Sequence, residues 1–194
     1  MGIEFVIPTY NRTDHLFTIV CSILAQTNPN WKIHIVGDNI PNENLERLHS
    51  FLNVIKDHRI KFTNLEKRYN DWGHTPRNYG LKEATEEWVV LTGEDNYYVP
   101  HFIDGMLEGI KKNTNFIYCN LVHNWVSNEY IPIKSELKYG SIDIGNFMTK
   151  TKLAQELELD VTINQADWRF IDEYIQRFKD GLIKKVEKVL YVHN

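Results

Sequence analysis

Apolar and polar residues follow one another along the first 120 residues in two patterns, one typical of strands and one of helices. Five short apolar runs predict buried strands, at residues 3–7, 31–36, 60–63, 88–92 and 115–119. Between these runs, apolar residues recur every three or four positions, and the clearest such stripe is Leu16, Ile19, Val20, Ile23 and Leu24. Strands that alternate with helices are typical of a mostly parallel central sheet flanked by helices on both faces.

The pattern changes after residue 120. Residues 121–150 are polar, aromatic and less periodic, and the rest of the chain predicts a strand at 144–148, a helix at 167–178 and a last strand at 186–192. No flexible linker separates the two parts. We therefore expect one continuous α/β domain, in which residues 1–120 form one half and residues 121–194 form the other.

The composition narrows the class of protein. With 194 residues, 42% of them hydrophobic and 25% charged, the chain can form a sizeable core and reads as globular. The net charge is -4 and there is no basic tail, which argues against a nucleic-acid partner. No apolar run approaches the ~18 residues that span a bilayer, and Glu4 interrupts the amino-terminal stretch that could resemble a signal peptide. We expect no membrane span and a cytoplasmic location.

The most informative segment is the apolar run from Trp88 to Leu91, which leads into Thr-Gly-Glu-Asp-Asn at 92–96. Glu94 and Asp95 have no basic residue between or beside them, so they predict a cation or a polar ligand at this turn. Oxygen ligands suit Mg²⁺ and Mn²⁺, which are often shared with the phosphates of a substrate. Ligands of such sheets bind at the carboxyl ends of the strands. We expect four loops to meet there, at residues 8–13, 37–39, 92–98 and 120–125.

The first strand-to-helix turn excludes two common nucleotide-binding motifs. Residues 8–13 read Pro-Thr-Tyr-Asn-Arg-Thr and lack the glycines that bring a pyrophosphate close to the backbone in dinucleotide-binding folds. The chain also has no P-loop sequence.

Seven segments match a known family instead. They read FVIPTYNR at 5–12, IHIVGDN at 33–39, TPRNYGLKEA at 75–84, WVVLTGEDNYYVP at 88–100, IDIGNFM at 142–148, ADW at 166–168 and YVHN at 191–194. In the order and spacing of these segments, the chain resembles the family-2 glycosyltransferases. The resemblance covers nearly the whole chain and implies a GT-A (Rossmann-like) fold. It also implies an inverting transfer of a sugar from a nucleotide-sugar donor.

The resemblance assigns nucleotide binding to Pro8, Thr9, Tyr10, Arg12, Asp38, Arg77 and Glu94. Tyr10 offers a flat face for stacking, and Arg12 can reach a phosphate or a base. Asp38 matches the acidic residue that accepts a hydrogen bond from a uracil ring. Arg77 falls in the first turn of a predicted helix, where the partial positive charge of the helix suits an anion. Glu94 stands where the family more often has aspartate.

The resemblance also implies a metal ion and a catalytic base. Asp95 and His193 match the metal ligands, and an imidazole beside a carboxylate favours Mn²⁺ over Mg²⁺. Asp167 matches the base that takes the proton from the acceptor hydroxyl as its oxygen attacks the anomeric carbon. The same position, at the start of a predicted helix, would also suit a residue that only caps the helix.

Contacts with the sugars are expected at four positions: Gly145, Asn146, Trp125 and Trp168. Gly145 and Asn146 match the family's loop in which glycine lets the donor sugar approach the backbone. Trp125 and Trp168 are aromatic residues in a loop and at a helix start, and aromatic faces are surfaces on which sugars dock.

Together these features predict an inverting glycosyltransferase that uses a nucleotide diphosphate donor, with a UDP-sugar favoured and a TDP-sugar left open. The acceptor is a hydroxyl of a glycan or of another molecule. One alternative is a non-catalytic module that binds carbohydrate or nucleotide-sugar and has kept the fold. Another is one domain of a larger enzyme that builds polysaccharide.

Overall fold

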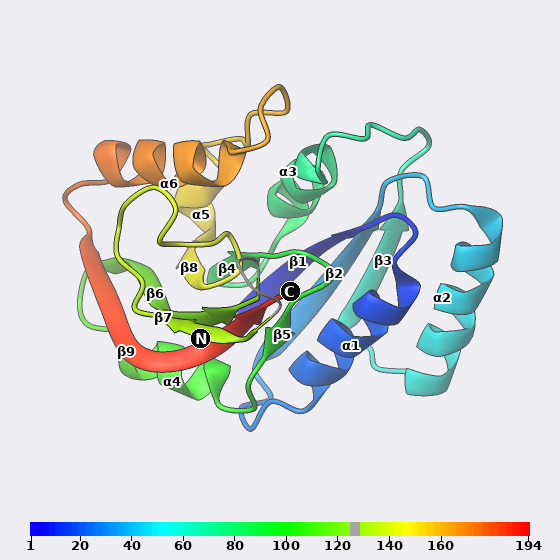
Figure 1. The fold of residues 1–194 in the computed structure, drawn as a ribbon, viewed down its shortest axis with the longest axis horizontal. Coiled ribbons are helices and arrows are strands. Elements are labelled where there is room, and N and C mark those ends of the chain that lie inside the picture. The colour runs from blue at the N-terminus through cyan, green and yellow to red at the C-terminus, as the bar shows by residue number, and fades with distance from the viewer. Residues whose placement is uncertain (125–128) are drawn as a thin grey trace.

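The strand β1 (Ile3–Thr9) lies inside the parallel part of the sheet in the computed structural model, which describes residues 1–124 and 129–194. It pairs in parallel with β2 (Trp31–Gly37) on one side and with β4 (Trp88–Leu91) on the other. The strand β3 (Ile60–Asn64) extends this part beyond β2, again in parallel. A helix connects each of these strands to the next, as the alternating sequence pattern predicts (Figure 1).

Antiparallel pairings complete the sheet. The strand β8 (Phe147–Lys150) lies between β4 and β6 (Thr114–His123) and is antiparallel to both. The long strand β9 (Leu182–His193) is parallel to β6. Two short strands, β5 (Tyr97–Tyr98) and β7 (Ile131–Ile133), pair antiparallel with β9 and β6. The predicted α/β fold is confirmed, but the sheet is mixed, because its parallel pairings are confined to β3-β2-β1-β4 and to β6-β9.

Helices cover both faces of the sheet (Figure 1). One face packs against α1 (Thr13–Leu24), α2 (Asn42–Ile55) and α4 (Phe102–Glu108). The other packs against α3 (His74–Glu83), α5 (Thr151–Ala154) and α6 (Ala166–Arg177). Successive residues of a strand point to opposite faces. Phe5 is accordingly buried in the first of these two cores and Val6 in the second.

Several strand boundaries differ from the predicted ones. The strand β6 continues to His123 instead of ending at 119, so residues 120–123 of the loop predicted at 120–125 belong to a strand, and β9 begins at Leu182 instead of 186. Pro8 does not end β1, which continues to Thr9. The backbone N–H of Thr92, just after β4, donates to the carbonyl of Val6. Pro8 lies two residues further along β1 and faces the same side, where pairing with β4 has already stopped. Its missing N–H therefore costs no hydrogen bond of the sheet. The strand predicted at 144–148 begins later, because the side chain of Asn146 accepts from the backbone N–H of Asp143 and closes a turn there.

The carboxyl ends of β1, β2, β3 and β4 lie at one edge of the sheet, because these strands are parallel. The loops that follow these strands therefore meet at that edge. None of the helices in the described ranges has both the length and the apolar character that crossing a bilayer requires.

Candidate functional site

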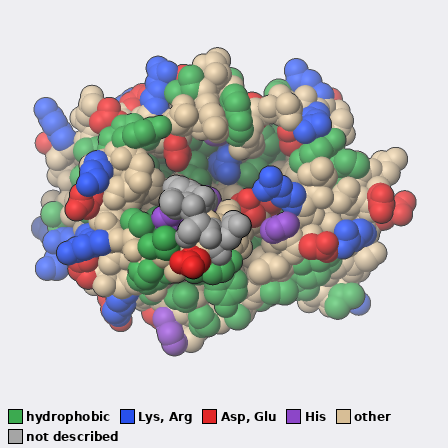
Figure 2. All heavy atoms as spheres, in the orientation of Figure 1, with side chains coloured by type: hydrophobic (Ala, Val, Ile, Leu, Met, Phe, Trp, Pro, Cys, Tyr) green, Lys and Arg blue, Asp and Glu red, His purple; other side chains and the backbone are tan. Residues whose placement is uncertain are grey.

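Two adjoining cavities open at this edge of the sheet. The larger has a volume of about 240 Å³ and the smaller about 160 Å³. Both are lined by Trp72, Arg77, Gly93 and Asp95. In Figure 2, acidic, basic and histidine side chains gather around a hollow near the middle of the face shown. All the residues expected to bind the nucleotide line the larger cavity: Pro8, Thr9, Tyr10, Arg12, Asp38, Arg77 and Glu94.

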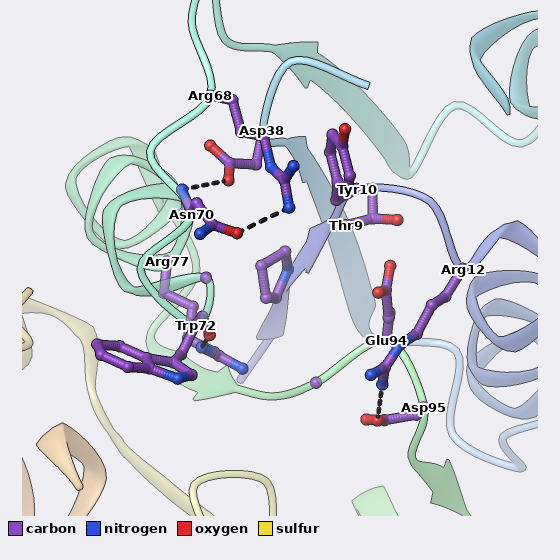
Figure 3. Close-up of a pocket in the computed structure, with 13 residues that line it drawn as sticks. Thr9, Tyr10, Arg12, Asp38, Arg68, Asn70, Trp72, Arg77, Glu94 and Asp95 are labelled. Atoms are coloured by element: carbon purple, nitrogen blue, oxygen red, sulfur yellow. Dashed lines mark hydrogen bonds and ion pairs between the residues drawn. The ribbon is translucent and has the colours of Figure 1, made fainter. Parts of the chain in front are cut away.

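Asp38, which follows β2, holds the loop between β3 and α3 in place. Its carboxylate accepts hydrogen bonds from the backbone N–H groups of Tyr69 (2.8 Å) and Asn70 (3.0 Å), and Figure 3 shows the second of these. The same loop places the guanidinium of Arg68 3.6 Å from the centre of the Tyr10 ring. A carboxylate can accept more bonds than these two, so Asp38 can anchor the loop and still face the cavity.

Arg77, from the first turn of α3, lies between the two cavities. Its Nε donates to the carbonyl of Thr92 (2.9 Å) and its Nη1 to the carbonyl of Trp72 (2.9 Å). Burial lowers the pKa of this guanidinium, and the nearby carboxylates, Asp143 foremost, oppose that shift. An arginine keeps its charge in proteins. The site therefore contains a fixed, buried positive charge whose orientation is set by two backbone carbonyls.

The acidic turn after β4 faces this charge and a second arginine. Arg12 Nη1 lies 2.7 Å from Asp95 Oδ2 (Figure 3). Burial raises the pKa of Glu94, and the nearby charge of Asp95 raises it further. Glu94 Oε2 is buried and has no hydrogen-bond partner among the described residues, and the same is true of Asn96 Oδ1. Buried polar atoms normally have partners, so these two indicate a polar ligand.

The smaller cavity contains the residue expected to be the catalytic base. Asp167 lies at the start of α6, and its Oδ1 accepts a 2.8 Å hydrogen bond from the backbone N–H of Trp168. Burial raises the pKa of Asp167, and the negative charge of Asp143 contributes in the same direction. A carboxylate with a raised pKa is a stronger base than an exposed one, and such shifts are typical of catalytic residues.

Asp143 lies beside it and connects three parts of the chain. Its Oδ1 accepts bonds from the hydroxyl of Tyr191 (2.6 Å) and from the backbone N–H of Gly145 (2.9 Å). Its Oδ2 lies 3.3 Å from Nε2 of His193. Asp143 is itself 7% exposed. It therefore fixes the end of β9, which carries His193, against the loop before β8.

The residues expected to hold a metal ion share the smaller cavity. Asp95 and His193 both line it, which fits a carboxylate and imidazole donor pair. Each also has a protein partner: Arg12 for Asp95 and Asp143 for His193. Within residues 1–124 and 129–194, no three histidine, cysteine or acidic side chains are placed to hold an ion together. With Asp95 and His193 as its protein ligands, an ion there would need phosphate oxygens and water for the rest of its coordination.

Three of the residues expected at the sugars lie outside both cavities. Asn146 is fully buried, and its side-chain amide donates to the carbonyl of Cys119 and to Ser135 Oγ. At Gly145 an added Cβ would lie 2.5 Å from the Tyr191 hydroxyl, so this glycine makes room for Tyr191. Trp168 is half-buried and packs against the core beneath α6. Trp125 lies outside the described residues.

Several cavity residues are absent from the sequence-based set. From the loop between β3 and α3 come Arg68 and Asn70, and the smaller cavity adds Asn96, Asp143 and Asn164. A usable signal existed for the loop, since β3 was predicted as a strand of the parallel sheet, and its carboxyl end had to lie at the same edge.

Comparison with known proteins gives these observations a family. The model of the family described as "Glycosyl transferase family 2" matches residues 4–176 of this chain. A poly-beta-1,6-N-acetyl-D-glucosamine synthase of Staphylococcus epidermidis is 29% identical over 112 residues, which cover 58% of this chain and 26% of that protein. The chain spans 19% to 45% of the length of the curated relatives it matches.

Two solved structures share the fold over nearly the whole chain. The structure of S. aureus TarS 1–349 has a TM-score of 0.80 at 18% identity and covers 100% of this chain and 60% of that one; TarS has also been solved with UDP and with UDP-GlcNAc. The mannosyltransferase PcManGT from Pyrobaculum calidifontis, in complex with GDP-Man and Mn²⁺, has a TM-score of 0.77 at 13% identity and covers 98% and 56%. The family prediction is confirmed: this chain belongs to family 2 of the glycosyltransferases and has the GT-A fold.

Proposed function

We propose that this chain transfers a sugar from a nucleotide diphosphate donor to a hydroxyl acceptor, with inversion at the anomeric carbon. The observation that carries the proposal is the continuity of the two cavities. The residues expected to bind the nucleotide line one cavity and Asp167 lines the other, while Arg77 and Asp95 line both. A diphosphate at this junction would extend its nucleoside into the larger cavity and its sugar into the smaller one.

The larger cavity suits a pyrimidine nucleotide. The Tyr10 ring, covered on one side by Arg68, offers a surface for base stacking. Asp38 provides carboxylate oxygens for a ring N–H, as in the uracil of UDP. The complexes of TarS with UDP and UDP-GlcNAc support a UDP-sugar as the donor, whereas PcManGT was solved with GDP-Man.

The diphosphate would lie against positive charge. Arg77 is held by the carbonyls of Thr92 and Trp72, which leaves Nη2 to donate to a phosphate oxygen without any reorientation of the side chain. Arg12 is exposed enough to turn from Asp95 toward the same phosphates, because its side chain is 58% exposed. Preorganised positive charge stabilises the negative charge that grows on a leaving group.

A divalent ion fits this arrangement as a shared ligand. Asp95 and His193 would hold Mn²⁺ or Mg²⁺ from the protein side, and the diphosphate would supply further oxygens. Such an ion supplies Lewis-acid stabilisation of the departing diphosphate. The complex of PcManGT with Mn²⁺ is consistent with this assignment.

Asp167 would act as the base on the opposite side of the donor sugar. Its carboxylate takes the proton of the acceptor hydroxyl while the hydroxyl oxygen forms a bond to the anomeric carbon. The bond between that carbon and the diphosphate oxygen breaks at the same time, and the nucleoside diphosphate leaves with the bonding electrons. Inversion follows because attack and departure occur on opposite faces.

The test combines nucleotide binding with turnover. We expect the wild-type protein with Mn²⁺ to release UDP from one member of a panel of UDP-sugars. Asp167→Asn should lower turnover by about 10²- to 10⁴-fold and leave the affinity for UDP within about twofold. The matched control is Asp172→Asn on the exposed side of the same helix. Full turnover in Asp167→Asn would exclude this base.

The alternative is a module that binds nucleotide-sugar without transferring it. The ion pair between Arg12 and Asp95 favours it to the extent that this pair competes with a metal ion. UDP binding without UDP release from any donor, with a broad panel of glycan acceptors present, would support the module. Absence of binding to UDP, TDP and GDP would contradict both functions.

A further inference from the structure

Trp72 has an unusual backbone conformation for a large aromatic residue. Its φ is 58°, in the left-handed region that glycine tolerates and other residues rarely adopt. Asn70 has a φ of 55° and Gly73 a φ of 82°, so the loop turns through this region at three of four consecutive positions. Such strain persists only where surrounding contacts impose it, and it often marks a functional site.

The surrounding contacts are visible on both sides of Trp72. Asp38 binds the backbone N–H groups of Tyr69 and Asn70, just before it. After it, the backbone N–H of Thr75, in the first turn of α3, donates a 3.0 Å bond to the carboxylate of Asp71. The carbonyl of Trp72 itself accepts from Arg77 Nη1. The loop is therefore held at its start, at its end and at Trp72.

The indole ring gains little burial in return. Trp72 is 57% exposed, whereas Trp31 and Trp88 are 3% and 0% exposed in the core. Its ring tilts at 43° to that of His74, with the ring centres 5.9 Å apart. In Figure 3 it lies on the side of the cavity opposite Arg12. A strained and exposed indole contributes little to folding, so its position calls for another explanation.

Its place beside the cavities supplies that explanation. Trp72 lines both cavities, while its own backbone carbonyl is bound to the arginine between them. The smaller cavity, which Trp72 lines, also contains Asp167. An acceptor whose hydroxyl loses its proton to Asp167 would therefore enter this cavity past Trp72. The flat face of an indole suits the C–H face of a pyranose ring, since it combines apolar contact with an electron-rich surface.

We propose that Trp72 is the platform on which a pyranose of the acceptor stacks, so that the acceptor is a carbohydrate. The proposal rests on the proposed function. The ring lies at the rim rather than on the floor formed by Arg77 and Asp143, which are 8% and 7% exposed. The donor sugar, attached to the diphosphate, would occupy that floor, and the acceptor sugar would lie outside it against the indole.

The test uses the strained backbone as an internal control for folding. Glycine normally makes a protein less stable than alanine does at the same position, but at a left-handed φ the order reverses. We therefore expect Trp72→Gly to melt about 1–3 °C above Trp72→Ala. We expect neither variant to melt more than about 2 °C below the wild type. A ring needed for packing would instead lower the melting temperature of both variants by several degrees.

Acceptor and donor binding are then measured separately. The probes are methyl β-glycosides of glucose, galactose and N-acetylglucosamine. Their binding is measured by saturation-transfer NMR with UDP and Mn²⁺ present. We expect Trp72→Ala to weaken glycoside binding at least tenfold, Trp72→Phe to retain part of it, and both to bind UDP within about twofold of the wild type. The control is Tyr139→Ala, an aromatic residue that is 63% exposed and lines neither cavity.

The possible results separate the two proposals. Unchanged glycoside binding in Trp72→Ala would overturn the acceptor platform, as would a wild-type protein that binds UDP but none of the glycosides. A loss of UDP affinity in Trp72→Ala would place the ring on the donor instead and would also overturn it. A wild-type protein that binds none of UDP, TDP and GDP contradicts the proposed function itself.

Discussion

Arg12 and Asp95 form an ion pair of 2.7 Å, although 83 residues separate them in the chain. Arg12 follows β1 and Asp95 follows β4, and these two strands are neighbours in the parallel sheet. The pair places the positive charge of Arg12 beside the carboxylate of Asp95, which we propose as a metal ligand. Under the proposed function, Arg12 and a divalent ion would therefore compete for Asp95 until a diphosphate offers Arg12 another partner.

This competition predicts the behaviour of Arg12→Gln. Exposed ion pairs are worth about 0.2–1 kcal/mol, so removal of Arg12 should strengthen Mn²⁺ binding in the absence of nucleotide by up to about fivefold. The same change should weaken UDP binding, because a phosphate partner is lost. Free Mn²⁺ can be followed by electron paramagnetic resonance and UDP by calorimetry. Arg47→Gln, which breaks an exposed ion pair with Asp14 on α1, is the control. Equal Mn²⁺ affinity in all three proteins would refute the competition.

A second prediction concerns Tyr191 and Tyr174, two buried tyrosines whose hydroxyls have different kinds of acceptor. Tyr191 donates to the carboxylate of Asp143 (2.6 Å) and Tyr174 to the carbonyl of Asn115 (2.9 Å), and they are 0% and 1% exposed. Hydrogen bonds to charged groups contribute about 1.5–3 kcal/mol and those between neutral groups about 0.5–1.5 kcal/mol. Tyr191→Phe should therefore lower the free energy of unfolding in urea more than Tyr174→Phe does. Equal losses would mean that Asp143 has another way to satisfy its charge.

Much of the fold follows from local sequence patterns. The stripe at Leu16, Ile19, Val20 and Ile23 is fully buried in α1, and the run from Trp88 to Leu91 is a buried strand. The nucleotide-side residues could be placed together because parallel strands bring their carboxyl ends to one edge. That inference needs only the order of strands and helices, which periodicity reveals.

Other features depend on contacts that periodicity cannot reveal. The strand β5 has only two residues, too few to show an alternation. Asp143 acquires its place in the site through Tyr191, 48 residues away, and through His193. The left-handed backbone at Trp72 results from Asp38 and Arg77 acting on either side of the loop. Each of these contacts arises only when distant segments pack.

Gly145 gives a third prediction, because two explanations of this glycine differ. The family resemblance places it at the donor sugar, whereas in the structure an added Cβ would lie 2.5 Å from the hydroxyl of Tyr191. Overpacking of this kind costs about 1–3 kcal/mol, so Gly145→Ala should lower the free energy of unfolding. The ratio of UDP-GlcNAc affinity to UDP affinity should stay unchanged. Gly140→Ala is a control in open space, where only the positive φ of 73° opposes the change. A selective loss of UDP-GlcNAc affinity would restore the sugar contact.

The last prediction concerns the response of the fold to acid. His34 on β2 is 0% exposed, and its Nε2 lies 3.0 Å from Thr63 Oγ1. Burial, with a smaller contribution from Lys61, lowers the pKa of His34 from 6.5 to about 4. Between these two values the unfolded chain binds the proton that the folded protein excludes. The contribution of neutral His34 to the free energy of unfolding is therefore fully present above pH 6.5. It falls as the pH drops toward 4, by at most about 3 kcal/mol.

His34→Gln separates this histidine from the other titrating groups. Glutamine does not titrate, and its amide can still bond to the hydroxyl of Thr63. We expect the wild type to lose more free energy of unfolding between pH 7 and pH 5 than His34→Gln does, by about 1.5–2 kcal/mol. His15→Gln, at an exposed position of α1, should follow the wild type. Carboxyls with raised pKa values act with the opposite sign, since burial of Asp167 and Glu94 disfavours their charged forms. A parallel pH dependence in His34→Gln and the wild type would mean that the acid response comes from elsewhere in the protein.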